Sequence, residues 1–322
     1  MKAAVLYHPG AADQFRLEER PVPVPAAGQV LLRVRAFGLN RSELMTRKGL
    51  SPGVQFPRIL GIECVGEVVQ DPSGEYPPGQ QVAALMGGLG RDYDGSYAEY
   101  TVVPNTILYP FRSSLPWAQL GAIPELFQTV YGSLHLALKI QTGQTLLIRG
   151  GTSSVGLLAA QLARQAGLTV LATTRRPDRA ALLPAHGAPH VLVDDGQLRE
   201  QVRALFPQGV DVALELVGAT TLRDTLGCLR PGGLCCMTGM LSENWSIPDF
   251  APMEFIPATV GLTIYDSGKV TAPAPALQAF IDSVEAGRVQ LPIGRTFALA
   301  NIVAAHQLMA DNAAGGKLVV VT

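Results

Sequence analysis

The sequence is poor in cysteine and histidine, and the few that occur are scattered. Its 322 residues include four cysteines and five histidines. Cys235 and Cys236 are adjacent, so on a strand they would point to opposite faces and make poor disulfide partners. No C-x-x-C pair occurs, and no two histidines stand at metal-ligand spacing. The sequence therefore predicts no structural zinc site and cysteines that behave as small buried hydrophobes.

Charge of one sign and long apolar runs are missing as well. The formal net charge is −1, and no basic run exceeds a few residues, which argues against nucleic acid as the main partner. No apolar stretch is long enough to span a bilayer. The opening segment MKAAVLYHPGAADQF has too short an apolar part for a secretory signal. We therefore expect a soluble cytoplasmic protein that binds neither membranes nor nucleic acid.

What the chain does have is one well-marked supersecondary unit at residues 145–176, TLLIRGGTSSVGLLAAQLARQAGLTVLATTRR. A short apolar strand at 146–148 leads into a turn of small residues. A helix is predicted over 155–166 and a second strand over 169–173. Strand, turn, helix and strand within about thirty residues form a βαβ unit, which closes right-handed on a parallel sheet.

The turn of this unit is a candidate binding site for a dinucleotide. A diphosphate binds backbone N–H groups at a helix N-terminus, and the G-x-G-x-x-G fingerprint leaves room for it. Gly151 and Gly156 fill the first and third positions, while Ser153 replaces the middle glycine. Serine is small and its hydroxyl is itself able to bind phosphate. The alternative is a turn that only packs the helix against the sheet.

The end of the second strand bears on which dinucleotide would bind. An NAD site usually carries an acid there, whereas an arginine suits the 2′-phosphate of NADP. The chain reads Thr174, Arg175, Arg176, with no acid before Asp178. This pattern favours NADPH as the cofactor. The alternative is that both arginines are solvated and open a helix at Pro177.

The rest of the chain predicts two domains, one inserted into the other. Residues 1–121 carry short β-type runs, such as 96–103, between Pro- and Gly-bearing loops, which is typical of a compact β-barrel-like domain. Residues 122–272 alternate strands and helices, including a helix at 178–186 and strands at 233–238 and 259–265. This indicates a doubly wound parallel sheet. Residues 273–322 return to the first pattern and complete the first domain.

In such a sheet, ligands bind at the carboxyl ends of the strands. Two of these ends read Val217-Gly218 and Gly239-Met240. Small or apolar residues there permit close approach by a cofactor.

Several blocks along the chain resemble one family in order and spacing: GLNRSELMTRKG, FPRILGIECVGEVV, ELFQTVYGSL, RGGTSSVGLLAAQLA, GVDVALELVG and GGKLVVV. The chain resembles the medium-chain dehydrogenase/reductase superfamily, in its zinc-independent quinone oxidoreductase branch, over nearly its whole length. The resemblance implies an α/β architecture: a GroES-like β-barrel domain plus a Rossmann domain, with the active site in the cleft. It also implies a homodimer joined through the strand at 259–265.

The resemblance makes metal chemistry testable from the sequence. Zinc alcohol dehydrogenases of this superfamily place their ligands where this chain has Asn40, Ile62 and Glu125. Isoleucine cannot bind a metal and asparagine is a poor zinc ligand, so no metal site is expected. Without a Lewis acid to lower an alcohol's pKa, we expect hydride transfer to an acceptor that is already electrophilic. The expected reaction is reduction of a quinone or an α,β-unsaturated carbonyl by NADPH.

The resemblance also suggests site residues, each with a structural alternative. Asn40 would donate to the nicotinamide carboxamide or to the substrate oxygen, or else it is a turn residue. Thr129 would bind the ribose or nicotinamide, or else it is an ordinary buried helical threonine. Tyr265 would line the cleft or a dimer contact, and Lys317 would lie near the cofactor or be a solvated lysine that opens a strand. The catalytic candidates are Asn40 and Thr129, and the cofactor-binding candidates are Gly151, Thr152, Ser153, Ser154, Val155, Thr174, Arg175, Arg176, Val217, Gly218, Gly239, Met240, Tyr265 and Lys317.

Two other functions stay compatible with these residues. One is an alcohol dehydrogenase or enoyl reductase that uses another acceptor. The other is a binding protein that keeps the NADPH site without turnover, because no strong general acid stands in the motifs.

Overall fold

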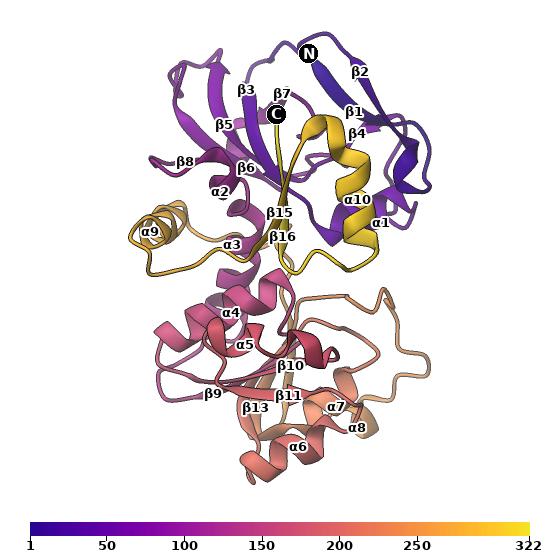
Figure 1. The fold of residues 1–322 in the computed structure, drawn as a ribbon, viewed down its shortest axis with the longest axis vertical. Helices are drawn as coiled ribbons and strands as arrows, with labels where there is room; N and C mark the ends of the chain where they lie inside the picture. The colour runs from indigo at the N-terminus through magenta and orange to yellow at the C-terminus, as the bar shows by residue number, and fades with distance from the viewer. The chain divides into compact units, whose positions relative to one another are not determined.

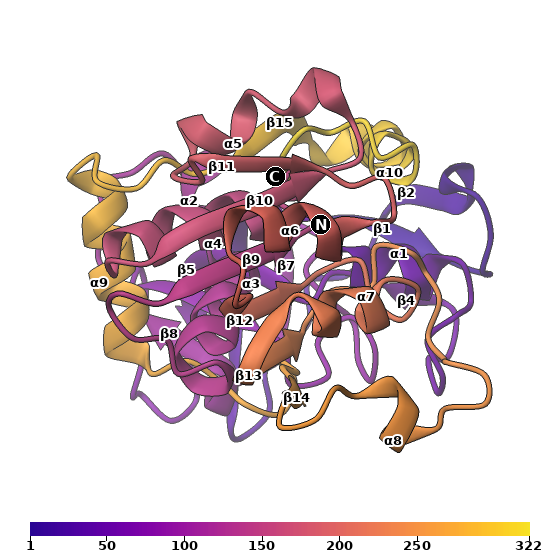
Figure 2. The ribbon, with the colours of Figure 1, turned by 90° about the horizontal axis from the view of Figure 1, so that it is seen from below.

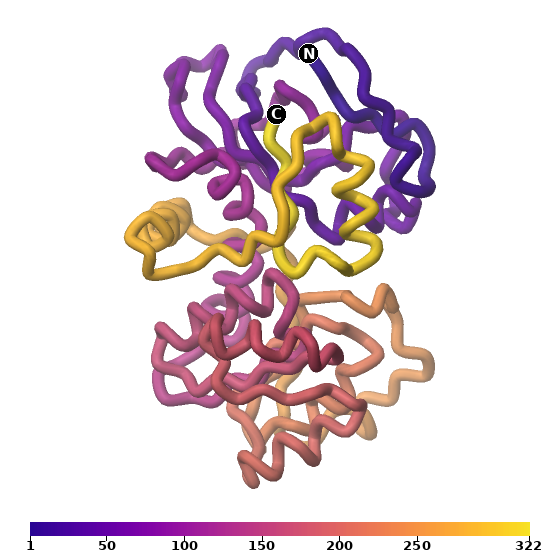
Figure 3. The backbone as a smooth tube through the Cα atoms, viewed as in Figure 1, coloured from indigo at the N-terminus to yellow at the C-terminus, as the bar shows by residue number.

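The computed structural model describes residues 1–322 and divides into two compact units. The first unit comprises Met1–Phe127 and Ala272–Thr322, and the second comprises Gln128–Thr271. Both ends of the chain belong to the first unit. Figure 3 shows the yellow C-terminal segment returning to the indigo and purple N-terminal part of that unit.

The first unit is built from two β-sheets. Seven strands form the larger sheet in the order β15-β16-β3-β5-β6-β8, with β7 also pairing β3, and three strands form the smaller sheet β2-β1-β4. Only β15 and β16 pair in parallel. The strands are β1 (Lys2–Leu6), β2 (Phe15–Glu19), β3 (Gln29–Gly38), β4 (Arg58–Ile59), β5 (Glu63–Gln70), β6 (Gln81–Leu85), β7 (Tyr100–Pro104), β8 (Leu108–Pro110), β15 (Ile293–Ala298) and β16 (Lys317–Val321). Alternation of apolar and polar residues in these strands buries one continuous core that includes Phe37 and Tyr97.

Short helices complete the first unit. They are α1 (Arg41–Arg47), α2 (Trp117–Leu120), α9 (Ala274–Glu285) and α10 (Ile302–Ala310). Helix α1 starts with a capping box formed by Asn40 at the N-cap and Glu43 at the third helical position. The Glu43 carboxylate accepts a hydrogen bond from the Asn40 N–H. Helix α3 (Pro124–Tyr131) crosses the boundary between the units and continues as a π-helix over Gly132–Ala137.

The second unit is a six-stranded sheet in the order β11-β10-β9-β12-β13-β14, and Figure 2 shows these strands side by side in that order. Every pair is parallel. The strands are β9 (Thr145–Arg149), β10 (Thr169–Thr174), β11 (His190–Val193), β12 (Val210–Glu215), β13 (Leu229–Met237) and β14 (Gly261–Ile264). The strand order reverses between β9 and β12, so right-handed crossovers cover both faces with helices. The predicted doubly wound sheet and the GroES-like plus Rossmann α/β class are confirmed.

The helices of this unit connect the strands. They are α4 (Ser154–Gln165), α5 (Leu182–Ala185), α6 (Leu198–Leu205), α7 (Leu222–Gly227) and α8 (Pro252–Phe255), and Figure 1 places them around the sheet. Apolar side chains of α6 and α7 bury Leu147, Leu171 and Ala213 of the central strands in one core.

Some boundaries differ from the expectation. The helix predicted over 178–186 is instead a 3-10 turn, Pro177–Arg179, followed by the single turn α5. Pro184 lies inside the predicted helix and lacks the N–H that a continuous helix needs. The strand predicted over 259–265 is shorter, because Thr259 has a φ of 66°, outside the extended region. The run 96–103 becomes strand only from Tyr100, and the strand predicted over 233–238 already begins at Leu229.

All four cysteines are free and buried, as the sequence predicts. No helix is at once long and apolar enough to cross a bilayer.

Candidate functional site

The turn between β9 and α4 has the geometry of an anion-binding helix start. Ser153 is the N-cap: its Oγ accepts from the Gly156 N–H at 3.1 Å and donates to the Gly150 carbonyl at 2.8 Å. The hydroxyl is thus used within the turn itself. The backbone N–H groups of Thr152, Ser154 and Val155 have no partner in the protein, and these residues are partly exposed. Three free amides at the positive end of a twelve-residue helix suit a phosphate.

Three glycines make this turn possible. Gly150 has a φ of 86°, which a side chain would strain. A Cβ on Gly151 would lie 2.8 Å from Cβ of Ala172, and one on Gly156 would lie 2.6 Å from the Gly151 carbonyl oxygen. The helix therefore packs on the turn and the turn packs on β10. The middle position tolerates serine because its side chain points into the cap.

The end of β10 adjoins this turn. The Gly151 N–H donates to the Thr173 carbonyl at 2.9 Å, and the Gly150 N–H donates to Oγ1 of Thr173 at 3.1 Å. Arg175 and Arg176 follow directly and are both exposed. The structure thus places the two predicted phosphate-binding arginines beside the turn, within the same unit.

The predicted residues at two further strand ends also come together. A Cβ on Gly218 would lie 3.1 Å from Sδ of Met240 and 3.2 Å from the Gly239 oxygen, and one on Gly150 would lie 3.5 Å from Cγ2 of Val217. Gly239 has no room for a side chain, because a Cβ would meet the Leu216 backbone at 2.3 Å. The ends of β9, β10, β12 and β13 therefore form one edge.

Beneath this edge lies a buried charged network that the sequence reasoning missed. Arg149, 1% exposed, donates through Nε and a terminal nitrogen to both Asp194 oxygens, at 2.7 and 2.8 Å. Its other terminal nitrogen reaches Asp224 at 2.8 Å and Oγ1 of Thr225 at 3.0 Å. Arg149 ends β9, so this network ties the residue before the phosphate turn to β11 and α7. The sequence carried one signal for this network, which is an arginine at the end of an otherwise apolar strand.

Glu215 extends the network to the next strand end. Its Oε1 accepts from the N–H groups of Val217 at 2.6 Å and Gly218 at 3.0 Å, and its Oε2 accepts from Oγ1 of Thr225 at 2.5 Å. Burial raises the pKa of Glu215 despite these donors. The carboxylate thus holds the loop Val217-Gly218 at the end of β12.

The first unit contains a second buried cluster, formed by Asn40, Glu43, Glu63 and Lys317. Nζ of Lys317 donates to Oε1 of Glu63 at 2.7 Å and to Oδ1 of Asn40 at 2.5 Å. Lys317 is 3% exposed and Glu63 is 0% exposed, so the interpretation of Lys317 as a solvated lysine is wrong. A Cβ on Gly38 would lie 2.3 Å from Cε of Lys317 and 2.5 Å from Oε1 of Glu63, so a side chain there would displace this pair.

Asn40 is held on both sides of its amide. Its Nδ2 donates to Glu63 at 2.9 Å and to Glu43 at 3.3 Å, while its Oδ1 accepts from Lys317. Both amide hydrogens are therefore engaged inside the protein, and only the long bond to Glu43 is easily given up. The side chain is partly exposed, so a ligand can still reach it. Glu63 and Glu43, neither of them predicted as site residues, fix its orientation.

Glu43 carries the most perturbed carboxyl of this cluster. Burial first, and the negative charge of Glu63 second, raise its pKa to about 7. It accepts hydrogen bonds from the N–H groups of Asn40 at 3.1 Å and Ile62 at 3.2 Å. The pKa of Lys317 is raised: burial alone would lower it, but the negative charges of Glu63, Glu125 and Glu43 together with the hydrogen bond to Glu63 outweigh that effect. The cluster therefore gains or loses a proton near neutral pH.

Thr129 and Tyr265 belong to the second unit. Thr129 is buried in α3, and its carbonyl accepts from Oγ of Ser133 at 2.7 Å. Tyr265 is buried, and its hydroxyl donates to the Val270 carbonyl at 2.6 Å. Its ring fills the space over Gly132, where a Cβ would lie 1.9 Å from Cζ. Packing within the unit thus occupies the ring and hydroxyl of Tyr265.

The donor set does not fit a zinc ion. Ile62 offers no ligand atom, and Asn40 is bound to Lys317, a cation that would repel a metal. No group of three or more histidine, cysteine, aspartate or glutamate side chains is placed to hold a metal ion anywhere in the chain.

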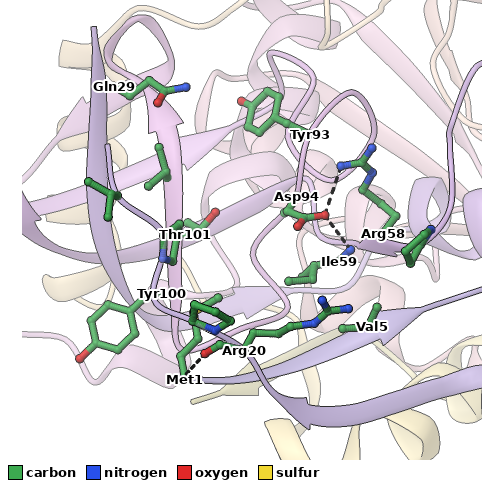
Figure 4. A pocket seen from close by; sticks show the side chains of 16 residues that line it. Met1, Val5, Arg20, Gln29, Arg58, Ile59, Tyr93, Asp94, Tyr100 and Thr101 are labelled. Carbon is green, nitrogen blue, oxygen red and sulfur yellow. Dashed lines mark hydrogen bonds and ion pairs between the residues drawn. The ribbon is translucent and has the colours of Figure 1, made fainter. Parts of the chain in front are cut away.

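A cavity of about 470 Å³ lies elsewhere in the first unit, and Figure 4 shows its lining. Arg58 donates to Asp94 at 3.1 Å across one side, and the Met1 ammonium donates to the Arg20 carbonyl at 2.8 Å on another. None of the predicted site residues lines it. This cavity is thus separate from the Asn40–Lys317 cluster.

Comparison with known proteins matches both units. Residues 26–113 match the family described as alcohol dehydrogenase GroES-like domain, and residues 154–276 match the family described as zinc-binding dehydrogenase. The chain is 27% identical to the 2-haloacrylate reductase of Burkholderia sp over 98% of each protein. It is 26% identical to the human quinone oxidoreductase over 99% of this chain and 97% of that protein. The solved structure of Escherichia coli quinone oxidoreductase complexed with NADPH shares the fold, with a TM-score of 0.89 at 20% identity over the whole of both chains.

Proposed function

Because the chain belongs to the medium-chain dehydrogenase/reductase superfamily, in its quinone oxidoreductase branch, and is therefore an oxidoreductase, we propose that it transfers hydride from NADPH to a quinone or an α,β-unsaturated carbonyl. The observation that carries this proposal is the turn at the start of α4, where three backbone amides are free between glycines that admit a diphosphate. Relatives named for reduction of a haloacrylate and of quinones support the acceptor class.

The cofactor in this proposal lies along one edge of the second unit. Gly151, Thr152, Ser153, Ser154 and Val155 bind the diphosphate through the backbone. Thr174, Arg175 and Arg176 bind the adenosine ribose and its 2′-phosphate. Val217, Gly218, Gly239 and Met240 contact the nicotinamide half, and Tyr265 supports it through the Gly132 segment. Lys317 is a further cofactor-binding candidate, and its Nζ holds Oδ1 of Asn40.

When bound, the nicotinamide supplies the hydride. The acceptor takes it at carbon, negative charge develops on the carbonyl oxygen, and a proton from solvent completes the reduction. The protein then mainly orients the reactants. In this proposal Asn40 releases its 3.3 Å bond to Glu43 and donates to the carboxamide or substrate oxygen, and Thr129 binds the ribose or nicotinamide.

A paired titration of NADPH and NADH, followed by fluorescence, tests the cofactor part of the proposal. We expect wild type to prefer NADPH and the double variant Arg175→Ala, Arg176→Ala to lose about 1.5–3 kcal/mol of that preference, as charge-assisted hydrogen bonds do. A screen of enones, quinones and alcohols then tests the acceptor. Binding of NADPH without oxidation by any acceptor would favour a non-catalytic binding protein, and turnover of alcohols alone would favour a dehydrogenase.

A homodimer belongs to the same proposal. Strand β14 is last in the sheet order and pairs only with β13, so one edge is open. Its residues, GLTI, are uncharged, and Ile264 is 61% exposed. An uncharged open edge invites pairing with another strand. A second copy of β14 across a twofold axis would cover it.

A further inference from the structure

The two arginines that follow β10 differ in what they contact. Arg176 forms a two-bonded ion pair with Asp178: Nε lies 3.2 Å from Oδ1, and a terminal nitrogen lies 2.6 Å from Oδ2. Arg175 is exposed and makes no hydrogen bond or ion pair. One guanidinium is therefore open to a ligand, while the other already holds a carboxylate.

The backbone keeps Asp178 in this position. The Arg176 N–H donates to Oγ1 of Thr174 at 3.0 Å, and the same hydroxyl donates to the Arg176 carbonyl at 3.1 Å. Pro177 then begins the 3-10 turn. In this turn the Arg179 N–H donates to the Arg176 carbonyl at 2.9 Å. Asp178 lies in the middle of this turn, two residues after Arg176. The local backbone therefore holds the two side chains close together.

We propose that Asp178 is a specificity-determining residue, which narrows the preference for NADPH over NADH by occupying Arg176. The inference rests on the proposed function, in which the end of β10 receives the adenosine ribose. A 2′-phosphate binds a guanidinium through the same planar edge as a carboxylate, so the two compete for Arg176. The Asp178 carboxylate also repels the phosphate.

Asp178 should favour the binding of NADH, in contrast to that of NADPH. It carries ribose hydroxyls in place of the 2′-phosphate, and a carboxylate at the end of this strand accepts from such hydroxyls. Arg175 then remains the main contact for the phosphate of NADPH. The pair is 55% and 60% exposed, and exposed ion pairs are weak. A phosphate therefore displaces Asp178 at a modest penalty, and the protein uses both cofactors.

The test compares dissociation constants of NADPH and NADH, measured by fluorescence titration, for wild type and Asp178→Asn. We expect the variant to bind NADPH about fivefold more tightly at low salt, an effect of the size of an exposed ion pair, and to bind NADH no more tightly than wild type. Glu200→Gln is the matched control, because it removes the same charge from an exposed position on α6. Arg176→Gln should weaken NADPH binding more in the Asp178→Asn background than in wild type.

An unchanged ratio of the two constants in Asp178→Asn would overturn the inference, and so would an equal change in Glu200→Gln. With tight binding of either cofactor retained, that result contradicts the inference alone. Wild type that binds neither cofactor would contradict the proposed function and the inference together. A gain that shrinks as salt increases supports the electrostatic cause.

Discussion

Lys317 and Glu63 form an ion pair inside the first unit, with Nζ donating to Oε1 across 2.7 Å and neither side chain more than 3% exposed. They are 254 residues apart in the chain. The pair joins β16 to β5, which lie on either side of β3 in the sheet, and both residues bond the Asn40 amide. A buried charge needs its partner far more than an exposed one does.

Removal of this lysine should therefore destabilise the protein strongly. Lys317→Met leaves the Glu63 charge buried without its cation, which typically costs about 3–5 kcal/mol. Urea unfolding followed by fluorescence measures the loss. The double variant Lys317→Met, Glu63→Gln should recover part of it, because no charge is then left unpaired. Lys269→Met is the control: that lysine is 79% exposed in its pair with Asp266, and its loss should cost less than about 1 kcal/mol.

The stability of the protein should depend on pH through Glu43. Its pKa is about 7 in the folded protein and 4.5 as a free side chain, so the folded state holds the proton more tightly. The stabilisation from proton binding is complete below pH 4.5 and is lost as the pH rises to 7, a change of about 3 kcal/mol. Unfolding curves at several pH values should show this slope in wild type, relative to Glu43→Gln. Identical slopes in the two proteins would contradict the prediction.

The comparison with Glu43→Gln is needed because another buried group titrates in the opposite sense. Burial lowers the pKa of His306 to about 3. Its contribution is present above pH 6.5 and is lost as the pH falls, since the unfolded chain takes the proton first. The effect of His306 is common to both proteins and cancels in their difference.

The cofactor turn should not tolerate a methyl group at Gly156. The new Cβ would lie 2.6–2.8 Å from backbone atoms of Gly150 and Gly151, so the turn must shift. Overpacking of this kind costs about 1–3 kcal/mol. We expect Gly156→Ala to weaken NADPH binding about tenfold or more, as measured by fluorescence titration. Gly227→Ala in α7, where a Cβ would first meet the flexible Arg199 side chain at 3.1 Å, should bind NADPH as wild type does.

Sedimentation velocity at micromolar protein tests the pairing of β14 edges. We expect wild type to sediment as a dimer and Ile264→Lys to sediment as a monomer, because a lysine on an edge strand opposes pairing. Leu205→Lys places the same charge on an exposed apolar residue at the end of α6 and should stay dimeric. A monomeric wild type would rule out the predicted interface.

The sequence by itself determined the elements whose signals are local. The βαβ unit, the glycines of its turn and the alternation of strands and helices follow from periodicity and turn chemistry over short stretches. The position of Arg175 and Arg176 directly after β10 also follows from this unit. The predicted helix over 178–186 was wrong because Pro184 interrupts it.

Only the tertiary structure decided which charged side chains are buried together. Nothing near Lys317 in the chain indicates that it pairs with Glu63, or that Arg149 joins Asp194 and Asp224 beneath the turn. From the sequence alone, a charged residue is predicted to be exposed to solvent. Its burial and pairing depend on contacts between segments that are remote in the chain. The same contacts raise the pKa of Glu43 and engage the amide of Asn40.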